Sequence, residues 1–328
     1  MSTLTLKGPA WVTVRQYRRT LWLAGAAVVL AFAVIGGLRI WAAQHPVTTA
    51  KDGSWVAPDD GDGYLMLRWL LEYVGAAAVL LPIAVAALVA GPMVAREYES
   101  GTYQLSLTQS VSPVAWLRSK LSVATGVAFL VALAVTGIFW FGRIGVQEGW
   151  DYFWAEPGPY TTTGFTAFAH LLAAVAVGAL VGQLVRRTLP AMAVTMLITG
   201  PLTLAFTAYR WSILPTERIT GPLGTPLSLP EKEDLHMDSG LLTSSGARFD
   251  QTICWDQANR TPGSDTQQGL WEKVQTQCQA EHGVTTQFVD YHPESHYWPT
   301  QLIETGIVLA LAALAAFAAF RVLRARHP

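Results

Sequence analysis

The sequence predicts an all-α polytopic membrane protein with six transmembrane helices, both termini in the cytoplasm, and a large extracellular segment between helices 5 and 6. Half of the 328 residues are apolar and only 14% are charged, far below the roughly 25% of a soluble domain. Six apolar runs each reach or approach the roughly 20 residues that cross a bilayer as a helix. These runs are 20–38, 73–95, 121–142, 157–185, 188–209 and 298–320.

The distribution of charge orients these spans. Counted from a cytoplasmic N-terminus, the inner segments hold twelve of the 22 basic residues but only Glu97 and Glu99 of the 23 acids. Lys and Arg in short loops set the orientation of membrane proteins, so both termini are expected in the cytoplasm. The inner segments are 1–20, 91–120, 186–187 and 321–328.

Residues 1–19 are expected to form a cytoplasmic interfacial helix. Apolar and basic residues alternate there, which suits a helix at the membrane surface with Trp11 in the lipid and Arg15 and Arg18 toward the phosphates. An ordinary basic flank is the alternative. The first apolar run follows and is expected to be a retained signal anchor, because five further spans follow it.

The segment 20–209 is expected to hold spans 1 to 5. Arg68 and Glu72 enter the second span four residues apart, so they can pair on one helix face. Charge is costly in lipid, so both are expected to face protein or a water-filled cavity near the outer surface. A structural salt bridge and a contact with substrate both fit this spacing.

The fourth span carries a strip of small residues, Ala174, Gly178 and Gly182. Such a strip permits close helix approach, either within one chain or between two. His170 in the same span is expected to be a hydrogen-bonded packing residue. The short turn 186–190 predicts an antiparallel helical hairpin between the fourth and fifth spans.

The segment 210–298 is expected to be extracellular and stapled by a disulfide. Its two cysteines, Cys254 and Cys278, are the chain's only ones. A pair on the oxidising side indicates one bridge, closing a loop of about 25 residues and contributing roughly 3 kcal/mol. Two unrelated thiols are the alternative. The stretch 269–280 has helical character, and the rest is expected to be irregular or short strand.

The sixth span is expected at 299–322, followed by a cytoplasmic tail, 323–328. It contains Glu304, the best single candidate for a polar role near the outer gate. An acid close to a helix N-terminus is also favoured by the helix dipole alone. Glu304 therefore has two open interpretations.

The sequence offers no chemistry of its own. It contains no nucleotide-binding loop G-x-x-x-x-G-K-[ST], no H-E-x-x-H and no G-x-S-x-G, so we expect no enzyme activity, no catalytic residue and no bound cofactor. His292 and His296 come nearest to a metal site, but spacing fixes no third ligand. No metal is expected.

The inner loop 91–117, between the second and third spans, is longer than a turn and lacks the apolar pattern of a buried helix. Gly101 can end one helix, and Thr102 can cap the next, whose body at 103–109 would lie across the cytoplasmic face. Ser112-Pro113 then restarts the chain into the third span. A polar helix exposed in this position suits contact with another protein.

A family resemblance is carried by the stretch REYESGT at 96–102, followed by Leu105, Leu107 and Lys120. This pattern resembles the first cytoplasmic loop of the exporter-type permeases of ATP-binding cassette transporters, the ABC-2 family. The segments 11–19 and 297–304 are similar to forms met in actinobacterial members.

With the six-span plan, the likeness covers essentially the whole chain. One departure is that the segment 210–298 is longer than the short hairpin usual before the last span in this family.

The resemblance implies a half-transporter in a bacterial cell membrane. Its partners would be a second permease copy or paralogue, membrane lipid and two cytoplasmic ATPase subunits that bind ATP and Mg²⁺; no nucleic acid is implied. In such proteins the helix after Gly-Thr is the coupling helix seated in the ATPase, and the interfacial helix adds contacts. The coupling residues carried over are Arg96, Glu97, Glu99, Gly101, Thr102, Tyr103, Leu105 and Leu107.

The leading hypothesis is thus an exporter permease, with Arg68, Glu72 and Glu304 as candidates for the translocation path and an amphipathic or lipid-like substrate. The inner charges could instead be a simple topology signal, but such a signal needs no acids. A membrane-anchored receptor or hydrolase acting through 210–298 is the alternative. A secondary transporter would place ionisable residues near the bilayer midplane, whereas these three are expected toward the outer ends of their helices.

Overall fold

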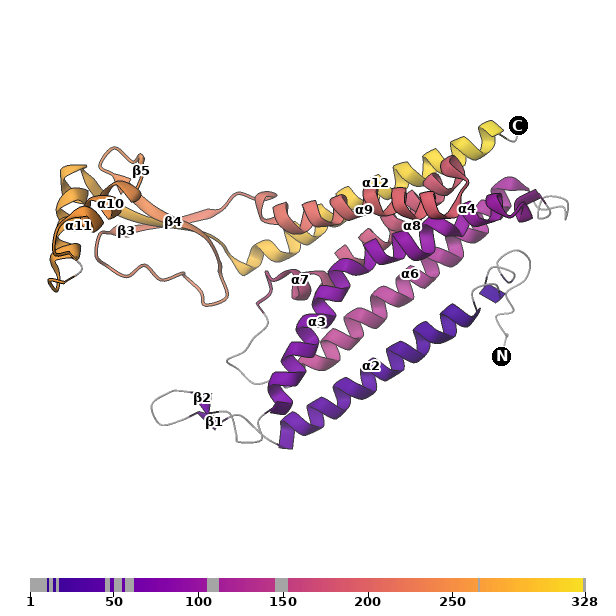
Figure 1. The fold of residues 1–328 in the computed structure, drawn as a ribbon, viewed down its shortest axis with the longest axis horizontal. Coiled ribbons are helices and arrows are strands. Elements are labelled where there is room, and N and C mark those ends of the chain that lie inside the picture. The colour runs from indigo at the N-terminus through magenta and orange to yellow at the C-terminus, as the bar shows by residue number, and fades with distance from the viewer. Residues whose placement is uncertain are drawn as a thin grey trace. The chain divides into compact units, whose positions relative to one another are not determined.

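The computed structural model describes residues 11, 14–15, 18–44, 48–49, 55–56, 62–104, 112–144, 153–264 and 266–326. Among them, six helices are long and apolar enough to cross a membrane, which confirms the predicted polytopic six-helix fold (Figure 1). The cytoplasmic position of the termini and the extracellular position of 210–298 stay predictions. Two compact units are present, Met1–Arg210 with Gln301–Pro328, and Trp211–Thr300.

The spanning helices belong to the first unit, apart from the start of the last one. The second span is one continuous helical rod made of three parts, in which a π-helical turn joins a long helix to a short one. The spans are formed by α2 (Arg18–Gln44), α3 (Asp62–Val85) with η1 (Ala86–Ala90) and α4 (Gly91–Glu99), α6 (Pro113–Arg143), α8 (Thr166–Val185), α9 (Thr188–Tyr209) and α12 (Tyr297–Arg326).

Helix α8 lies at the centre of this bundle. It contacts α3, α4, α6 and α9. In its most apolar 18-residue stretch 67% of the residues are buried, whereas the corresponding stretch of α2 is 6% buried. Helix α2 packs on α3 and α6 and leaves large apolar side chains such as Trp22 and Leu23 exposed. The apolar face of α2 therefore requires lipid or another apolar surface.

The strip of small residues in α8 packs within the chain, which decides between the two alternatives for it. A Cβ on Gly178 would lie 2.5 Å from the carbonyl carbon of Ala90, and a Cβ on Gly182 would lie 2.9 Å from the Cβ of Val94 and 3.0 Å from the backbone nitrogen of Ala95. The glycines thus bring α8 against the backbone of the second span, where the π-turn η1 passes into α4. Glycine is required here because any side chain would fill the contact.

The predicted hairpin between the fourth and fifth spans is confirmed. Two residues, Arg186 and Arg187, join α8 to α9, and the two helices pack on each other. Arg186 takes a left-handed conformation, with φ of 57°, and its N–H donates to the carbonyl of Gly182 at 3.1 Å. This is a common way to end a helix.

The fourth apolar run is not one helix, as the sequence predicts, but two. A short helix α7 (Pro157–Thr163) ends before Gly164, and α8 begins at Thr166. Helix α7 packs on α3, where the backbones of Gly158 and Gly75 meet so closely that a Cβ on Gly75 would lie 2.8 Å from the Gly158 Cα. Only α8 is long enough to span.

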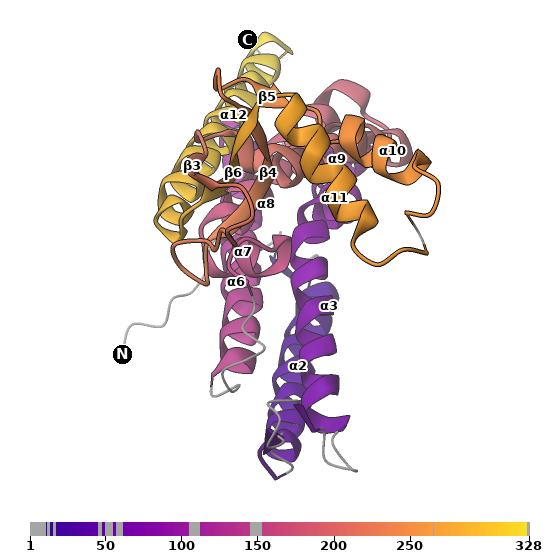
Figure 2. The ribbon, with the colours of Figure 1, turned by 90° about the vertical axis from the view of Figure 1, so that its left-hand side faces the viewer.

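The second unit is a four-stranded antiparallel sheet with two helices beside it (Figure 2). The predicted helix at 269–280 is confirmed as α11, whereas the nine-residue strands β4 and β6 are longer than the short strands expected. The sheet order is β3 (Glu217–Pro222), β6 (Val284–His292), β4 (Leu235–Thr243) and β5 (Arg248–Phe249), and the helices are α10 (Thr252–Arg260) and α11 (Leu270–Glu281).

Two features hold this unit together. The predicted disulfide is confirmed, since Cys254 of α10 is bonded to Cys278 of α11. In the sheet, Arg218 and Arg248 lie over the ring of Phe288, 4.2 and 4.7 Å from its centroid, and both donate to the buried Asp290. The hydrogen bond from Arg218 lowers the pKa of Asp290. Stacking and pairing thus supplement a small apolar core.

The glycine contact of α8 gives a test of this packing. We expect Gly178→Ala to destabilise the protein by roughly 1 to 3 kcal/mol, because the new methyl group overpacks the second span. The matched control is Gly126→Ala in α6, where a new Cβ meets nothing within 4 Å. The control should be neutral or slightly stabilising. Thermal unfolding in detergent micelles measures both, and equal midpoints for the two variants would contradict the packing.

Candidate functional site

The inner loop is tied to the third span through Glu97. Its Oε1 accepts a hydrogen bond from Lys120 Nζ at 2.6 Å, and its Oε2 accepts one from the indole Nε1 of Trp116 at 2.8 Å. Lys120 is only 2% exposed. A buried ammonium group requires such a partner. Glu97 therefore fastens the end of α4 to the first turns of α6.

An aromatic cluster surrounds this ion pair. The ring of Tyr103 lies 4.5 Å from that of Tyr98 and 4.8 Å from that of Trp116, measured between centroids. The guanidinium of Arg186 lies 5.3 Å from the centre of the Tyr98 ring. Leu323 of α12 joins the same apolar cluster. Tyr103 is 4% exposed, so it anchors the loop.

Glu99 ties the same loop to the fifth span. Its Oε2 accepts hydrogen bonds from the backbone N–H of Thr188, at 2.9 Å, and from the Thr188 hydroxyl. Thr188 is the first residue of α9. Glu99 thus satisfies a free N–H at a helix N-terminus, where a negative charge is also favoured by the helix dipole.

The remaining predicted coupling residues are partly visible. Gly101, with φ of 71°, follows the end of α4, as predicted for a helix end, and residues 102–104 are helical. Arg96 and Thr102 are exposed. Leu105, Leu107 and most of the predicted transverse helix at 103–109 lie outside the described residues, so this helix stays a prediction.

The chain re-enters the membrane as the sequence predicts. Helix α6 begins at Pro113, and its N-cap Ser112 accepts a hydrogen bond from the N–H of Ala115 at 3.2 Å. In the predicted interfacial helix, Trp11, Arg15 and Arg18 are helical and exposed, and the guanidinium of Arg15 lies 5.0 Å from the centre of the Trp11 ring. Their contact with lipid stays a prediction.

A buried polar cluster joins the fourth, fifth and sixth spans. Glu304 Oε1 lies 3.1 Å from His170 Nε2, and Glu304 Oε2 lies 3.8 Å from Arg210 Nε. The hydroxyl of Thr203 lies 3.4 Å from the other ring nitrogen of His170. Glu304, Arg210 and His170 are 0%, 3% and 6% exposed. A carboxylate can be buried here because cationic and polar partners surround it.

One turn before Glu304, Gln301 seals the helix break between α7 and α8. Its amide donates to the carbonyl of Tyr160 at 2.6 Å and accepts from the N–H of Phe165 at 3.2 Å. Its side chain occupies the space that a Cβ on Gly164 would fill. Backbone groups must be satisfied inside an apolar bundle, so Gln301 makes the break tolerable.

The cluster is a closed contact and not a substrate chamber. Among the described residues, the cavity beside Glu304 has a volume of about 10 Å³, which holds at most one water molecule. Glu304 lies two turns inside α12, which begins at Tyr297, too deep for the dipole interpretation of a helix-start acid. His170 and Arg210 explain its burial instead.

The other two predicted path residues, Arg68 and Glu72, form a separate pair. Arg68 Nε and Glu72 Oε1 are 2.9 Å apart, with side chains 30% and 49% exposed. The predicted pairing is therefore confirmed, in a half-exposed setting where such pairs contribute about 0 to 1 kcal/mol. The sequence grouped Arg68 and Glu72 with Glu304, but their surroundings differ.

Sequence reasoning missed two members of the cluster, Arg210 and Gln301. The sequence places Arg210 at the start of the segment 210–298, and it gives Gln301 no role beyond membership of the segment 297–304. The sequence does contain a signal for the pairing of Arg210 with Glu304. Arg210 ends the fifth apolar run and Glu304 lies near the start of the sixth, so the two side chains can meet at the same membrane surface. His170 was expected to be a hydrogen-bonded packing residue, and it is hydrogen-bonded.

The histidines near the end of β6 have structural partners. His292 contacts the carbonyl of Trp211 at 2.8 Å and a ring nitrogen of His296 at 2.9 Å. Burial lowers the pKa of His292. Among the described residues, no group of three His, Cys, Asp or Glu side chains could hold a metal ion.

Six apolar helices in the described part of the chain define a polytopic membrane protein. Residues 23–210 match the family model described as ABC-2 membrane transporter related. Because the match covers more than half of the chain, the chain belongs to this family, and the predicted family is confirmed. A search of curated proteins finds no match.

The ion pair of Lys120 can be tested by a double-mutant cycle. Glu97→Gln should lower the free energy of unfolding by about 3 kcal/mol, because it leaves Lys120 buried without its counter-charge. Adding Lys120→Met to this variant should recover part of the loss. Denaturation in mixed micelles measures each variant. Simple additivity of the two single changes would show that the pair is not coupled.

The buried polar cluster predicts that the same change, Glu to Gln, lowers stability much more at position 304 than at position 72. Glu304→Gln should destabilise the protein by about 3 kcal/mol, since it removes the negative charge beside the buried Arg210 and His170. Glu72→Gln removes the acid of a half-exposed pair and should cost less than about 1 kcal/mol. The same denaturation assay compares them. Equal effects would argue that Glu304 and Arg210 do not interact.

Proposed function

We propose that the chain is the transmembrane permease subunit of an ATP-binding cassette exporter. Family membership supplies the transport role, and the sequence contains no nucleotide-binding loop. A separate ATPase subunit, carrying ATP and Mg²⁺, would bind the inner loop 91–117. Closure of the ATPases would then move this loop and the helices fastened to it.

The bracing of the inner loop carries the proposal. Glu97 joins the loop to α6, and Glu99 joins it to α9. Both contacts are charge-assisted or charge-to-dipole interactions, which are stronger than neutral hydrogen bonds. A force on the loop is therefore applied to the second, third and fifth spans together. This explains why the loop contains two acids, which a topology signal does not need.

Helix α9 offers a path from this loop to the opposite end of the bundle. Thr188 at its start is held by Glu99, and Thr203 and Arg210 at its far end belong to the buried polar cluster. Its 22 residues extend about 33 Å at 1.5 Å per residue. A displacement of the loop would thus reach the contact of α9 with Glu304. Opening there would release substrate.

The proposed topology, the lipid contacts and the substrate class rest on the distribution of charge and on the apolar surface of the bundle. The excess of Lys and Arg around the inner loop supports cytoplasmic termini, and the disulfide supports an extracellular second unit. The bare apolar face of α2 suits lipid or a second permease copy. The bundle surface, with few charges, suits an amphipathic or lipid-like substrate in a bacterial cell membrane, with the interfacial residues Trp11, Arg15 and Arg18 at its inner surface.

The alternative, a receptor or hydrolase acting through 210–298, is not favoured by the family, which points to transport. We therefore keep the permease as the proposed function.

The decisive experiment uses Arg96, which is exposed at the end of α4. Arg96→Glu should abolish co-purification with a co-expressed partner ATPase subunit and should reduce stimulation of its ATP hydrolysis at least tenfold, because it reverses a charge on the proposed contact surface. Thermal unfolding of the variant should be unchanged, since the substitution changes an exposed side chain.

Arg260→Glu, in α10 of the second unit, is the matched control. Its side chain is 80% exposed, and it carries the same reversal of charge away from the loop. Normal complex formation by both variants would refute the proposed docking surface. Loss in both would indicate an effect of net charge and would refute it equally.

A further inference from the structure

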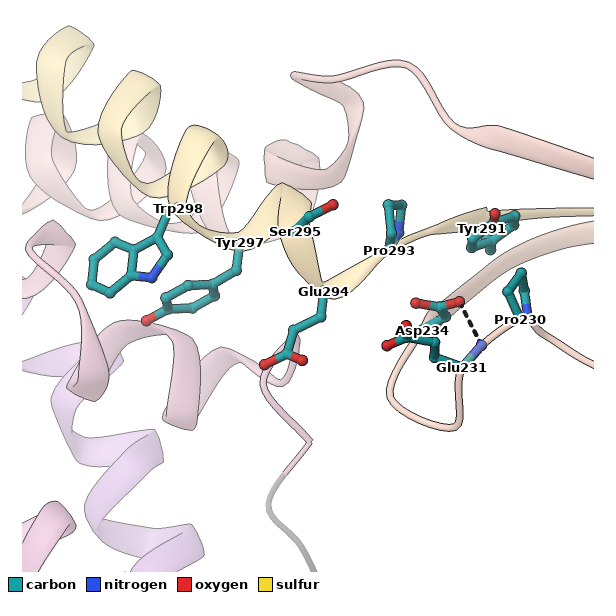
Figure 3. A pocket seen from close by; sticks show the side chains of 9 residues that line it. All are labelled: Pro230, Glu231, Asp234, Tyr291, Pro293, Glu294, Ser295, Tyr297 and Trp298. Carbon is teal, nitrogen blue, oxygen red and sulfur yellow. Dashed lines mark hydrogen bonds between the residues drawn. The ribbon is translucent and has the colours of Figure 1, made fainter.

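The second unit contains an open groove that the permease function does not use. It lies between the loop that carries Asp234 and the segment from the end of β6 to the start of α12, and its volume is about 510 Å³. In Figure 3, Tyr297, Trp298 and Glu294 lie on one side and Asp234 and Glu231 on the other. The lining residues are Pro230, Glu231, Asp234, Tyr291, Pro293, Glu294, Ser295, Tyr297 and Trp298.

This groove is negatively charged. Three of its nine lining residues are acids, Glu231, Asp234 and Glu294, and none of the nine is Lys, Arg or His. Asp234 is only 5% exposed, and its Oδ2 accepts the backbone N–H of Glu231 at 3.0 Å. The groove therefore favours a cation and repels an anion.

Aromatic rings supply the rest of the wall. Tyr297 and Trp298 meet edge to face, with ring centroids 5.1 Å apart, and Tyr291 lines the other side. Burial, with the nearby carboxylates of Glu217 and Asp234, raises the pKa of Tyr291, so its hydroxyl stays neutral. Neutral aromatic rings beside carboxylates attract cations through their faces and also bind apolar groups.

The volume of the groove and the spacing of its carboxylates indicate which kind of cation fits. The described residues contain no group of three acidic, His or Cys side chains close enough to hold one metal ion, so these carboxylates do not converge on a point charge. The volume falls within the roughly 300–1,000 Å³ of small-molecule sites. An organic cation, with its charge attached to an apolar body, matches both the spread carboxylates and the rings.

We propose that this groove binds a small organic cation, with its ammonium group between Glu294 and Asp234 and its apolar body against Tyr297 and Trp298. A lysine side chain of a peptide shares this chemistry, but the volume suits a whole small molecule. The proposal is independent of ATPase coupling, since the groove is built from the second unit alone.

The test is equilibrium dialysis of tritiated benzyltrimethylammonium against the full chain in phosphatidylcholine nanodiscs, with empty nanodiscs as the blank. We expect saturable binding that weakens about threefold between low and high salt, as screening requires. Unlabelled neopentylbenzene, the neutral isostere, should not displace the probe. Acetyl-lysine amide should displace it at least tenfold less well than unlabelled benzyltrimethylammonium does.

Variants locate the site. Glu294→Gln and Trp298→Leu, at exposed positions, should each weaken binding about fivefold through lost charge or cation–π attraction. Glu272→Gln, which removes an acid of α11 outside the groove, should leave binding within twofold.

Three results would overturn the proposal: no saturable binding, equal effects of Glu294→Gln and Glu272→Gln, or displacement by neopentylbenzene. Stronger displacement by the lysine compound would assign the groove to a peptide. None of these results bears on docking of the ATPase at Arg96, so the two proposals can fail separately.

Discussion

The structure depends on pairing the few charges that it buries among apolar helices. In the described bundle, Lys120 is buried with Glu97, and Glu304 is buried with His170 and Arg210. An unpaired charge in such surroundings would cost several kcal/mol. Each pairing joins different spans, so the requirement to neutralise charge also determines which helices are held together and at which end of the bundle.

The two pairings differ in their surroundings, and this difference suits different roles. The Glu97 pair lies beside exposed residues such as Arg96, at a surface that another protein can reach. The Glu304 cluster is closed, and its cavity has room for one water molecule at most. The first pairing is therefore close to a surface that another protein can contact, while the second holds helices α8, α9 and α12 together inside the bundle.

The sequence predicted elements whose cause is local. Apolar run length fixed the six spans, the turn at 186–190 gave the hairpin, and the disulfide followed from the two cysteines. The break at Gly164 was missed because it depends on Gln301, distant in the sequence. The partners of Glu97 and Glu304 were missed for the same reason, since charge spacing shows neighbours only along one helix. The groove in the second unit requires strand order, which the sequence did not show.

The glycine contacts of α8 lie near the end of the second span that carries Glu97 and Glu99. Gly178 and Gly182 hold the backbone of α8 against the π-turn η1 and α4, and packed interiors resist compression. Glu97 and Glu99 fasten the same end of this span to α6 and α9. The second span therefore cannot shift at this end unless α6, α8 and α9 follow or these contacts break.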